Sequence, residues 1–137
     1  MDSKDLFERF VAAIKARFYD VCIKPPTEQR SNRISFYVPN SNRNKRWMQV
    51  DWNAVSLSIA MDHLENDLSE NDVRSSGVEY GEFNGKNTRI ILHNNNAVFL
   101  TVFSNEPIDF EDNAFTEFLK KHFASYLKRV NRIDLLK

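Results

Sequence analysis

The sequence predicts a single α+β domain over residues 1–137, in which an antiparallel sheet of about six strands carries two long helices on one face. Apolar residues recur at helical spacing near both ends of the chain, and between these ends the spacing changes to alternation along short runs. Each expected helix has one apolar stripe and each expected strand one apolar face. The economical arrangement is therefore two layers, with a long N-terminal and a long C-terminal helix packed together on the same side of the sheet.

The first expected helix begins near Ser3, a residue type suited to the N-cap, and ends before Pro25 and Pro26. Its apolar stripe consists of Phe7, Phe10, Val11, Ile14, Phe18, Val21 and Cys22. Cys22 is the only cysteine, so no intramolecular disulfide can form. Its place on the stripe predicts a buried small hydrophobe rather than a reactive thiol.

The last expected helix has an apolar stripe from Phe115 to Val130, with acidic residues at its start and basic residues at its end. This order of charges suits the helix dipole. His122 lies on the stripe and is expected in the core or at its boundary.

Between the helices, alternation predicts strands over residues 33–38, 47–52 and 55–61, and two more strands on either side of the asparagines at 94–96. A short helical segment is expected near residues 64–74. The only three glycines lie between Gly77 and Gly85, and Asn84-Gly85 is a strong hairpin signal. We expect residues 78–83 and 86–93 to form that hairpin, with Tyr80 opposite Arg89; an irregular loop and a ligand cradle are the alternatives.

The net charge is zero, yet the charges are segregated along the chain. Between Lys24 and Trp47 there are six basic residues against one acid, and between Asp62 and Glu82 there are seven acids against one base. A neutral total argues against a protein that coats nucleic acid by charge alone, whereas local blocks can create opposed fields. The acidic block could imitate phosphate or pair with a basic partner.

No catalytic motif is present, and no catalytic residue, metal ligand or cofactor is assigned, so the sequence favours a non-enzymatic role. The alternative enzyme hypothesis is a metal-dependent hydrolase that uses acidic residues near 62–82, with Asp62, His63, Glu79 and Glu82 as its candidates. Neighbouring residues on a strand point to opposite sides, which makes a metal shared by Asp62 and His63 difficult. His93, at a strand end, is expected at the surface.

The face of the sheet away from the helices is expected to be open and rich in aromatic residues. Its candidate binding residues are Tyr37, Trp47, Arg89 and Phe99 on the face and Arg43, Lys45 and Arg46 at its edge. Aromatic and arginine side chains are the usual anchors of protein interfaces, so the hypothesis is a binding module of the inhibitor, immunity or adaptor type with a protein or nucleoprotein partner. Alternatively, the same residues could bind single-stranded or structured nucleic acid. The face could also be covered by a second copy of the chain, as a homodimer, or by residues 62–76.

No apolar run reaches the length of a membrane span and the first ten residues lack the features of a secretion signal, so a cytoplasmic protein without a membrane partner is expected. The order of strands and turns between residues 30 and 103 resembles that of small α+β domains that accompany bacterial restriction and DNA-handling proteins. This resemblance rests on element order and implies a bacterial or phage source; it carries no site residue.

Overall fold

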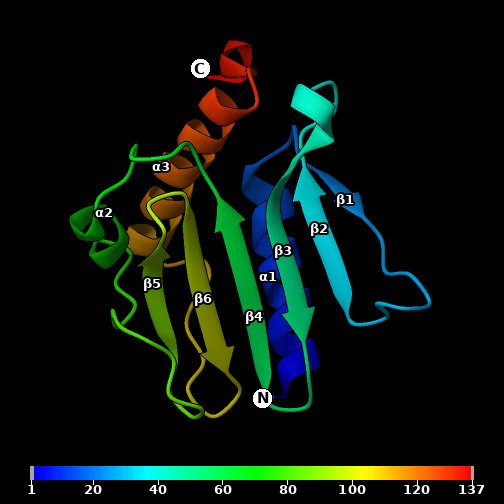
Figure 1. The fold of residues 1–137 in the computed structure, drawn as a ribbon. Helices are drawn as coiled ribbons and strands as arrows, with labels where there is room; N and C mark the ends of the chain where they lie inside the picture. The colour runs from blue at the N-terminus through cyan, green and yellow to red at the C-terminus, as the bar shows by residue number, and fades with distance from the viewer. Residues whose placement is uncertain (1, 137) are drawn as a thin grey trace.

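The computed structural model describes residues 2–136 (Figure 1). The helices are α1 (Ser3–Arg17), α2 (Glu70–Arg74) and α3 (Asn113–Arg129), and two 3-10 turns are η1 (Asn42–Asn44) and η2 (Ile133–Leu135). The strands are β1 (Cys22–Lys24), β2 (Arg33–Tyr37), β3 (Arg46–Trp52), β4 (Ser56–Asp62), β5 (Arg89–His93) and β6 (Ala97–Phe103). Among these residues, no helix combines the length and the apolar composition needed to cross a bilayer.

The strands form one six-stranded antiparallel sheet in the order β1-β2-β3-β4-β6-β5. Both long helices lie behind the sheet in Figure 1. Alternate strand residues meet the apolar stripes of the helices in one core, in which Phe10, Phe36 and Leu100 are fully buried. The α+β class and the antiparallel sheet are therefore confirmed.

The helix α1 starts and ends at other residues than the sequence predicts. The Asp2 carboxylate accepts a hydrogen bond from the Asp5 amide (2.8 Å), so Asp2 is the N-cap and Ser3 is already helical. The helix ends at Arg17, because Phe18 leaves the helical conformation at φ −121° and ψ 78°. The stripe that predicts a longer helix is thus shared between a helix and the chain that follows it.

The apolar stripe predicts Cys22 on this helix, and that placement is wrong. It lies in β1, paired with Tyr37 of β2, and is half-buried. Val21 and Cys22 are apolar at a spacing that suits the end of a helix, but the backbone groups of β2 are available for pairing, and tertiary pairing decides between the two conformations.

The helix α3 matches its predicted extent and stripe. Asp112 caps it by accepting a hydrogen bond from the Phe115 amide (3.2 Å). Near its other end, the Tyr126 hydroxyl donates to the Lys45 carbonyl (2.5 Å) and accepts from the Val38 amide (3.2 Å). Tyr126 thereby ties the last turns of α3 to the adjoining ends of β2 and β3.

The hairpin predicted over residues 78–93 is absent from the described chain. Tyr80 forms a parallel bridge with Ile90, in which the Gly81 amide donates to the Ile90 carbonyl (2.9 Å) and the Ile90 amide donates to the Glu79 carbonyl (3.0 Å). A parallel bridge requires the chain to travel back before it pairs, so residues 82–88 form a wide connection and Asn84-Gly85 lies within it. The Tyr80 ring packs against the Arg74 guanidinium at 4.4 Å rather than against Arg89.

The acidic segment that precedes this connection lies beside the sheet. Ser69 and Asp72 form a capping box at the start of α2, and Val73 is buried. Asp67 pairs with Lys128 and Asp72 with Lys121, both on α3. In Figure 1, α2 lies next to β5 at the edge of the sheet, so the alternative in which residues 62–76 cover the open face is wrong.

Candidate functional site

The open face of the sheet is the side turned toward the viewer in Figure 1, and no helix of the described chain crosses it. Strand pairing places its residues in rows: Ser35, Gln49, Ala60, Phe99 and Ile91 form one row across the sheet, and Arg33, Asp51, Ser58, Thr101 and Arg89 form the next. We use the term open face for these residues together with Tyr37, Arg46, Asp62 and His93. The two halves of this face differ in chemistry.

The half over β5 and β6 is aromatic and apolar. Phe99 is 40% exposed, and the His93 ring stacks on it with 4.4 Å between ring centroids. Ile91 pairs with Phe99 across the two strands and is half-buried. Within residues 2–136, Phe99 is the only exposed large hydrophobic side chain of the open face.

The half over β2, β3 and β4 is polar. A network of side chains, which we call the polar ladder, consists of Arg33, Asp51, Gln49, Arg46 and Asp62, which are joined by hydrogen bonds, and of Arg129 from α3, which forms a longer ion pair with Asp62 (3.9 Å). At one end, Arg33 Nε donates to Asp51 (2.5 Å), and Gln49 Nε2 donates to the other Asp51 oxygen (3.0 Å). At the other end, Arg46 Nε donates to Asp62 (2.8 Å). Acids and bases alternate along the ladder, so most of its charge is compensated inside the protein.

The prediction that Trp47 lies on the open face is wrong. Trp47 is fully buried on the helix side, next to Phe18 and Phe123. The cause is a β-bulge: Phe36 pairs with Met48, but Tyr37 pairs with Arg46, so Trp47 is an extra residue on β3. A bulge turns one side chain to the opposite face, and here it sends Trp47 into the core and leaves Arg46 on the open face.

The other predicted binding residues are dispersed over the open face and its end. Tyr37 is half-buried, and Arg46 belongs to the polar ladder. Arg89 donates to the Thr88 carbonyl (2.7 Å) and lies 3.9 Å from Glu106. In the turn before β3, Arg43 and Lys45 are exposed, and neither forms a salt bridge within the described residues.

The sequence did not reveal a buried chain of nitrogen-bearing rings behind the sheet. Trp47 Nε1 donates to His122 Nδ1 (2.9 Å), and His122 Nε2 lies 3.1 Å from His63 Nδ1. Both histidines are fully buried, as expected for His122. We call these three residues the indole–imidazole chain. The apolar stripe of the last helix predicts burial of His122, but no local pattern indicates that Trp47 and His63 are buried beside it.

The indole fixes the protons along this chain. Because an indole nitrogen only donates, His122 Nδ1 must accept, and a neutral His122 then carries its proton on Nε2. That proton is donated to His63 Nδ1, so His63 holds its own proton on Nε2, a buried atom with no partner within residues 2–136. Protonation of either histidine would place two donors face to face and break a hydrogen bond.

The surroundings of the indole–imidazole chain favour neutral rings at both His63 and His122. Burial lowers the pKa of His122 well below its ordinary value, and the neighbouring His63 lowers it further. Burial also lowers the pKa of His63, although Asp67 and Asp62 act in the opposite direction. Asp62 and His63 diverge to the two sides of the sheet, since Asp62 pairs with Arg46 while His63 contacts α3.

Within the 62–82 block, Asp67 and Asp72 are the acids that pair with lysines of α3. A hydrogen bond from Ser125, followed by one from Lys128, lowers the pKa of Asp67; a hydrogen bond from Lys121 lowers the pKa of Asp72. These carboxylates hold the segment on α3, so their loss would disturb the fold as well as any partner contact. No three His, Cys, Asp or Glu side chains of residues 2–136 are grouped to hold a metal ion.

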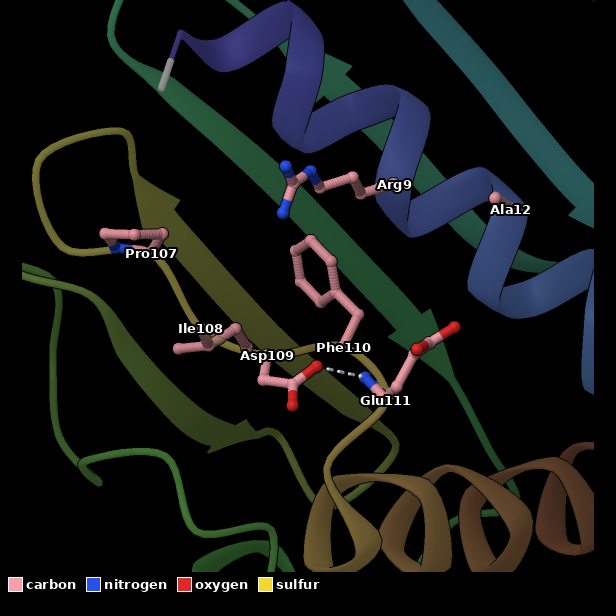
Figure 2. Close-up of a pocket in the computed structure, with 7 residues that line it drawn as sticks. All are labelled: Arg9, Ala12, Pro107, Ile108, Asp109, Phe110 and Glu111. Carbon is pink, nitrogen blue, oxygen red and sulfur yellow. Dashed lines mark hydrogen bonds between the residues drawn. The ribbon is translucent and has the colours of Figure 1, made fainter.

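A hollow of about 500 Å³ lies on the helix side, between α1 and residues 107–111 (Figure 2). Arg9 extends from α1 toward this space, and Phe110 points into it from the opposite wall. Asp109 accepts a hydrogen bond from the Glu111 amide (2.9 Å) at its rim. This hollow combines one base with two acids and shares no residue with the open face.

Comparison of the chain with models of protein families, with characterised proteins and with solved structures gives no match. The geometry of the open face and its surroundings therefore carries the functional argument.

Proposed function

We propose that this chain is a non-enzymatic binding module, of the inhibitor, immunity or adaptor type, that contacts a protein or nucleoprotein through the open face of its sheet. The single observation that carries the proposal is the uncovered aromatic centre on β6 and β5: Phe99 is 40% exposed and stacked by His93 at 4.4 Å. An exposed aromatic held rigidly on a strand is a suitable interface anchor, because little side-chain entropy is lost on binding.

The polar ladder supports the same proposal as the outer part of an interface. Its side chains are already oriented by hydrogen bonds to one another, and polar side chains typically surround the central anchor of a protein interface. The burial of Trp47 moves the centre of the proposed contact from β3 to Phe99.

Nucleic-acid binding has less support as a function for this face. Arg43 and Lys45 remain exposed, but Arg46 is held by Asp62, and Trp47 is unavailable for stacking on bases. A nucleoprotein partner remains within the proposal, with the protein component making the contact.

The test is capture of a partner from the source cells with the tagged chain of residues 1–137 and with its Phe99→Asp variant, each with and without nuclease. The matched control is Val55→Asp, because Val55 is 55% exposed in the turn between β3 and β4 and lies outside the open face. We expect a nuclease-resistant partner that Phe99→Asp loses and Val55→Asp keeps. Equal capture by all three chains would contradict the proposal.

A further inference from the structure

A hollow of about 320 Å³ lies at the end of the open face where residues 25–32 connect β1 to β2, and it shares Arg33, Ser35 and Gln49 with that face. This connection projects from the β1 edge of the sheet in Figure 1. We call it the basic hollow; the side chains that line it include those of Lys24, Thr27, Arg30, Arg33, Ser35 and Gln49. A second hollow of about 240 Å³ adjoins it, shares Arg30 and Arg33, and adds Asp51.

Among the bases that line the basic hollow, only Arg33 has its charge compensated by another described residue. Asp51 is the only acid that lines either hollow, and it already accepts from Arg33 (2.5 Å) and Gln49 (3.0 Å). Neither Lys24 nor Arg30 forms a salt bridge with any residue from 2 to 136. A concave surface lined by one sign of charge concentrates its field, so this region attracts anions although the protein is neutral as a whole.

The connection that carries Arg30 is ordered by its own hydrogen bonds. The Thr27 amide donates to the Arg30 carbonyl (3.3 Å), and the Arg30 amide donates to the Thr27 carbonyl (3.2 Å) and hydroxyl (3.1 Å). Pro25 and Pro26 restrict the backbone just before this turn. The backbone at Arg30 is therefore in place before a ligand arrives, which lowers the entropy lost on binding.

We propose that the basic hollow receives a short acidic segment of the partner protein, with Asp or Glu carboxylates bound by Lys24, Arg30 and the outer nitrogens of Arg33. This inference rests on the proposed function, because it names the chemistry that the partner presents next to the open face. Arginine binds carboxylates through parallel hydrogen bonds. The Nε of Arg33 already donates to Asp51, and this hydrogen bond orients the guanidinium so that its outer nitrogens can bind a second carboxylate.

Charge and distance favour an acidic protein segment over nucleic acid. A phosphate backbone that continued from the basic hollow across β3 would meet the carboxylates of Asp51 and Asp62. Phe99 lies three strands from β2, or about 14 Å at the usual strand spacing, which is too far for a base attached to a phosphate in the hollow. An acidic protein segment, in contrast, can carry only a few carboxylates, so its negative charge need not extend as far as Asp62 of the polar ladder.

Fluorescence anisotropy and ¹H–¹⁵N NMR titrations test this inference. The probes are a labelled peptide of alternating Glu and Gly and a labelled single-stranded oligothymidylate of the same charge, both at low ionic strength. The unsubstituted chain is compared with Lys24→Glu/Arg30→Glu, and the control is Lys4→Glu/Lys15→Glu, which changes the net charge equally at two exposed positions of α1. Circular dichroism establishes that each variant is folded.

We expect saturable binding of the acidic peptide, with shifted amide signals in residues 24–35 and at Gln49. The affinity should fall at least about tenfold in Lys24→Glu/Arg30→Glu, because repulsion replaces attraction, and much less in the control. No saturable binding, or an equal loss in both variants, would overturn the basic hollow as a site. Binding of the oligothymidylate without the peptide would overturn the choice of an acidic protein.

The outcome is separable from that of the proposed function. If Phe99→Asp loses the captured partner while Lys24→Glu/Arg30→Glu keeps it and binds the peptide unchanged, the inference fails and the open-face proposal stands. If the captured partner depends on Lys24 and Arg30 but not on Phe99, the proposal of a contact centred on Phe99 fails and the basic hollow stands.

Discussion

At the scale of single residues, the indole–imidazole chain makes the stability of the core depend on pH. His63 and His122 are neutral in the folded protein, and burial keeps the pKa of each below 6.5. The charged and titratable groups around His63 are Asp62 on β4, Asp67 on the segment before α2 and Arg129 on α3; His122 faces His63. An unfolded chain takes up protons at these histidines near pH 6.5.

We therefore predict that the free energy of unfolding is highest above about pH 6.5 and falls as the pH drops below it, because the unfolded state then binds more protons. The limiting slope is about 1.4 kcal/mol per pH unit for each histidine that stays neutral. Urea unfolding between about pH 7 and about pH 5 measures it. His93→Gln is the control and should keep the slope, since His93 is exposed. A flat profile would contradict neutral buried rings.

Trp47 offers a second test at the residue scale. Trp47→Phe keeps an aromatic ring but removes the donor to His122 Nδ1, leaving a buried acceptor unpaired. We expect a loss of about 1–3 kcal/mol in the free energy of unfolding, measured with urea. Trp52→Phe is the matched control and should cost less, because Trp52 is half-buried against Phe7 and its indole nitrogen makes no hydrogen bond inside the described chain. Equal losses would show that the hydrogen bond contributes little.

At the scale of elements, the capping box makes a prediction for α2. This five-residue helix is too short to be stable alone, so Ser69, Asp72 and the buried Val73 decide whether it forms. Ser69→Ala should cost about 0.5–2 kcal/mol and should speed amide hydrogen exchange from Glu70 to Ser76. Asn71→Ala, at an exposed position of the same helix, should leave exchange unchanged. Faster exchange throughout the sheet would contradict a local role.

Element types follow from local pattern, but their partners do not. The apolar stripe of α3 predicts that helix well, because in a long helix apolar residues recur every three or four positions over many turns. The Asn84-Gly85 pair predicts a turn, yet it cannot specify that Tyr80 pairs with Ile90 in the parallel direction. Likewise, the sequence does not reveal the extra residue in β3. Trp47 and Met48 are both apolar, and the alternating pattern assigns them to opposite faces although both are buried.

At the scale of the whole molecule, the open face makes a prediction about assembly. Stable homodimer interfaces are usually large and apolar, whereas Phe99 is the one large hydrophobic side chain classed as exposed on this face of the described chain. We therefore expect the purified protein to sediment as a monomer at micromolar concentration. A dimer that Phe99→Asp dissociates, and Val55→Asp does not, would identify a second copy as the occupant of the open face and contradict a different protein partner.

The sequence by itself determined the class of this protein, because amphipathic periodicity is a local property that each helix and most strands carry in their own residues. It also made Phe99 a candidate binding residue of the open face and showed that the stretch from Lys24 to Trp47, which contains Arg30 and Arg33, is basic. Only the tertiary structure decided which of these residues are available. A bulge buried Trp47, Asp62 engaged Arg46, and the β1–β2 connection gathered Lys24 and Arg30 around a hollow. Such outcomes depend on pairing between residues distant in sequence, and a local pattern does not encode which partner a side chain meets.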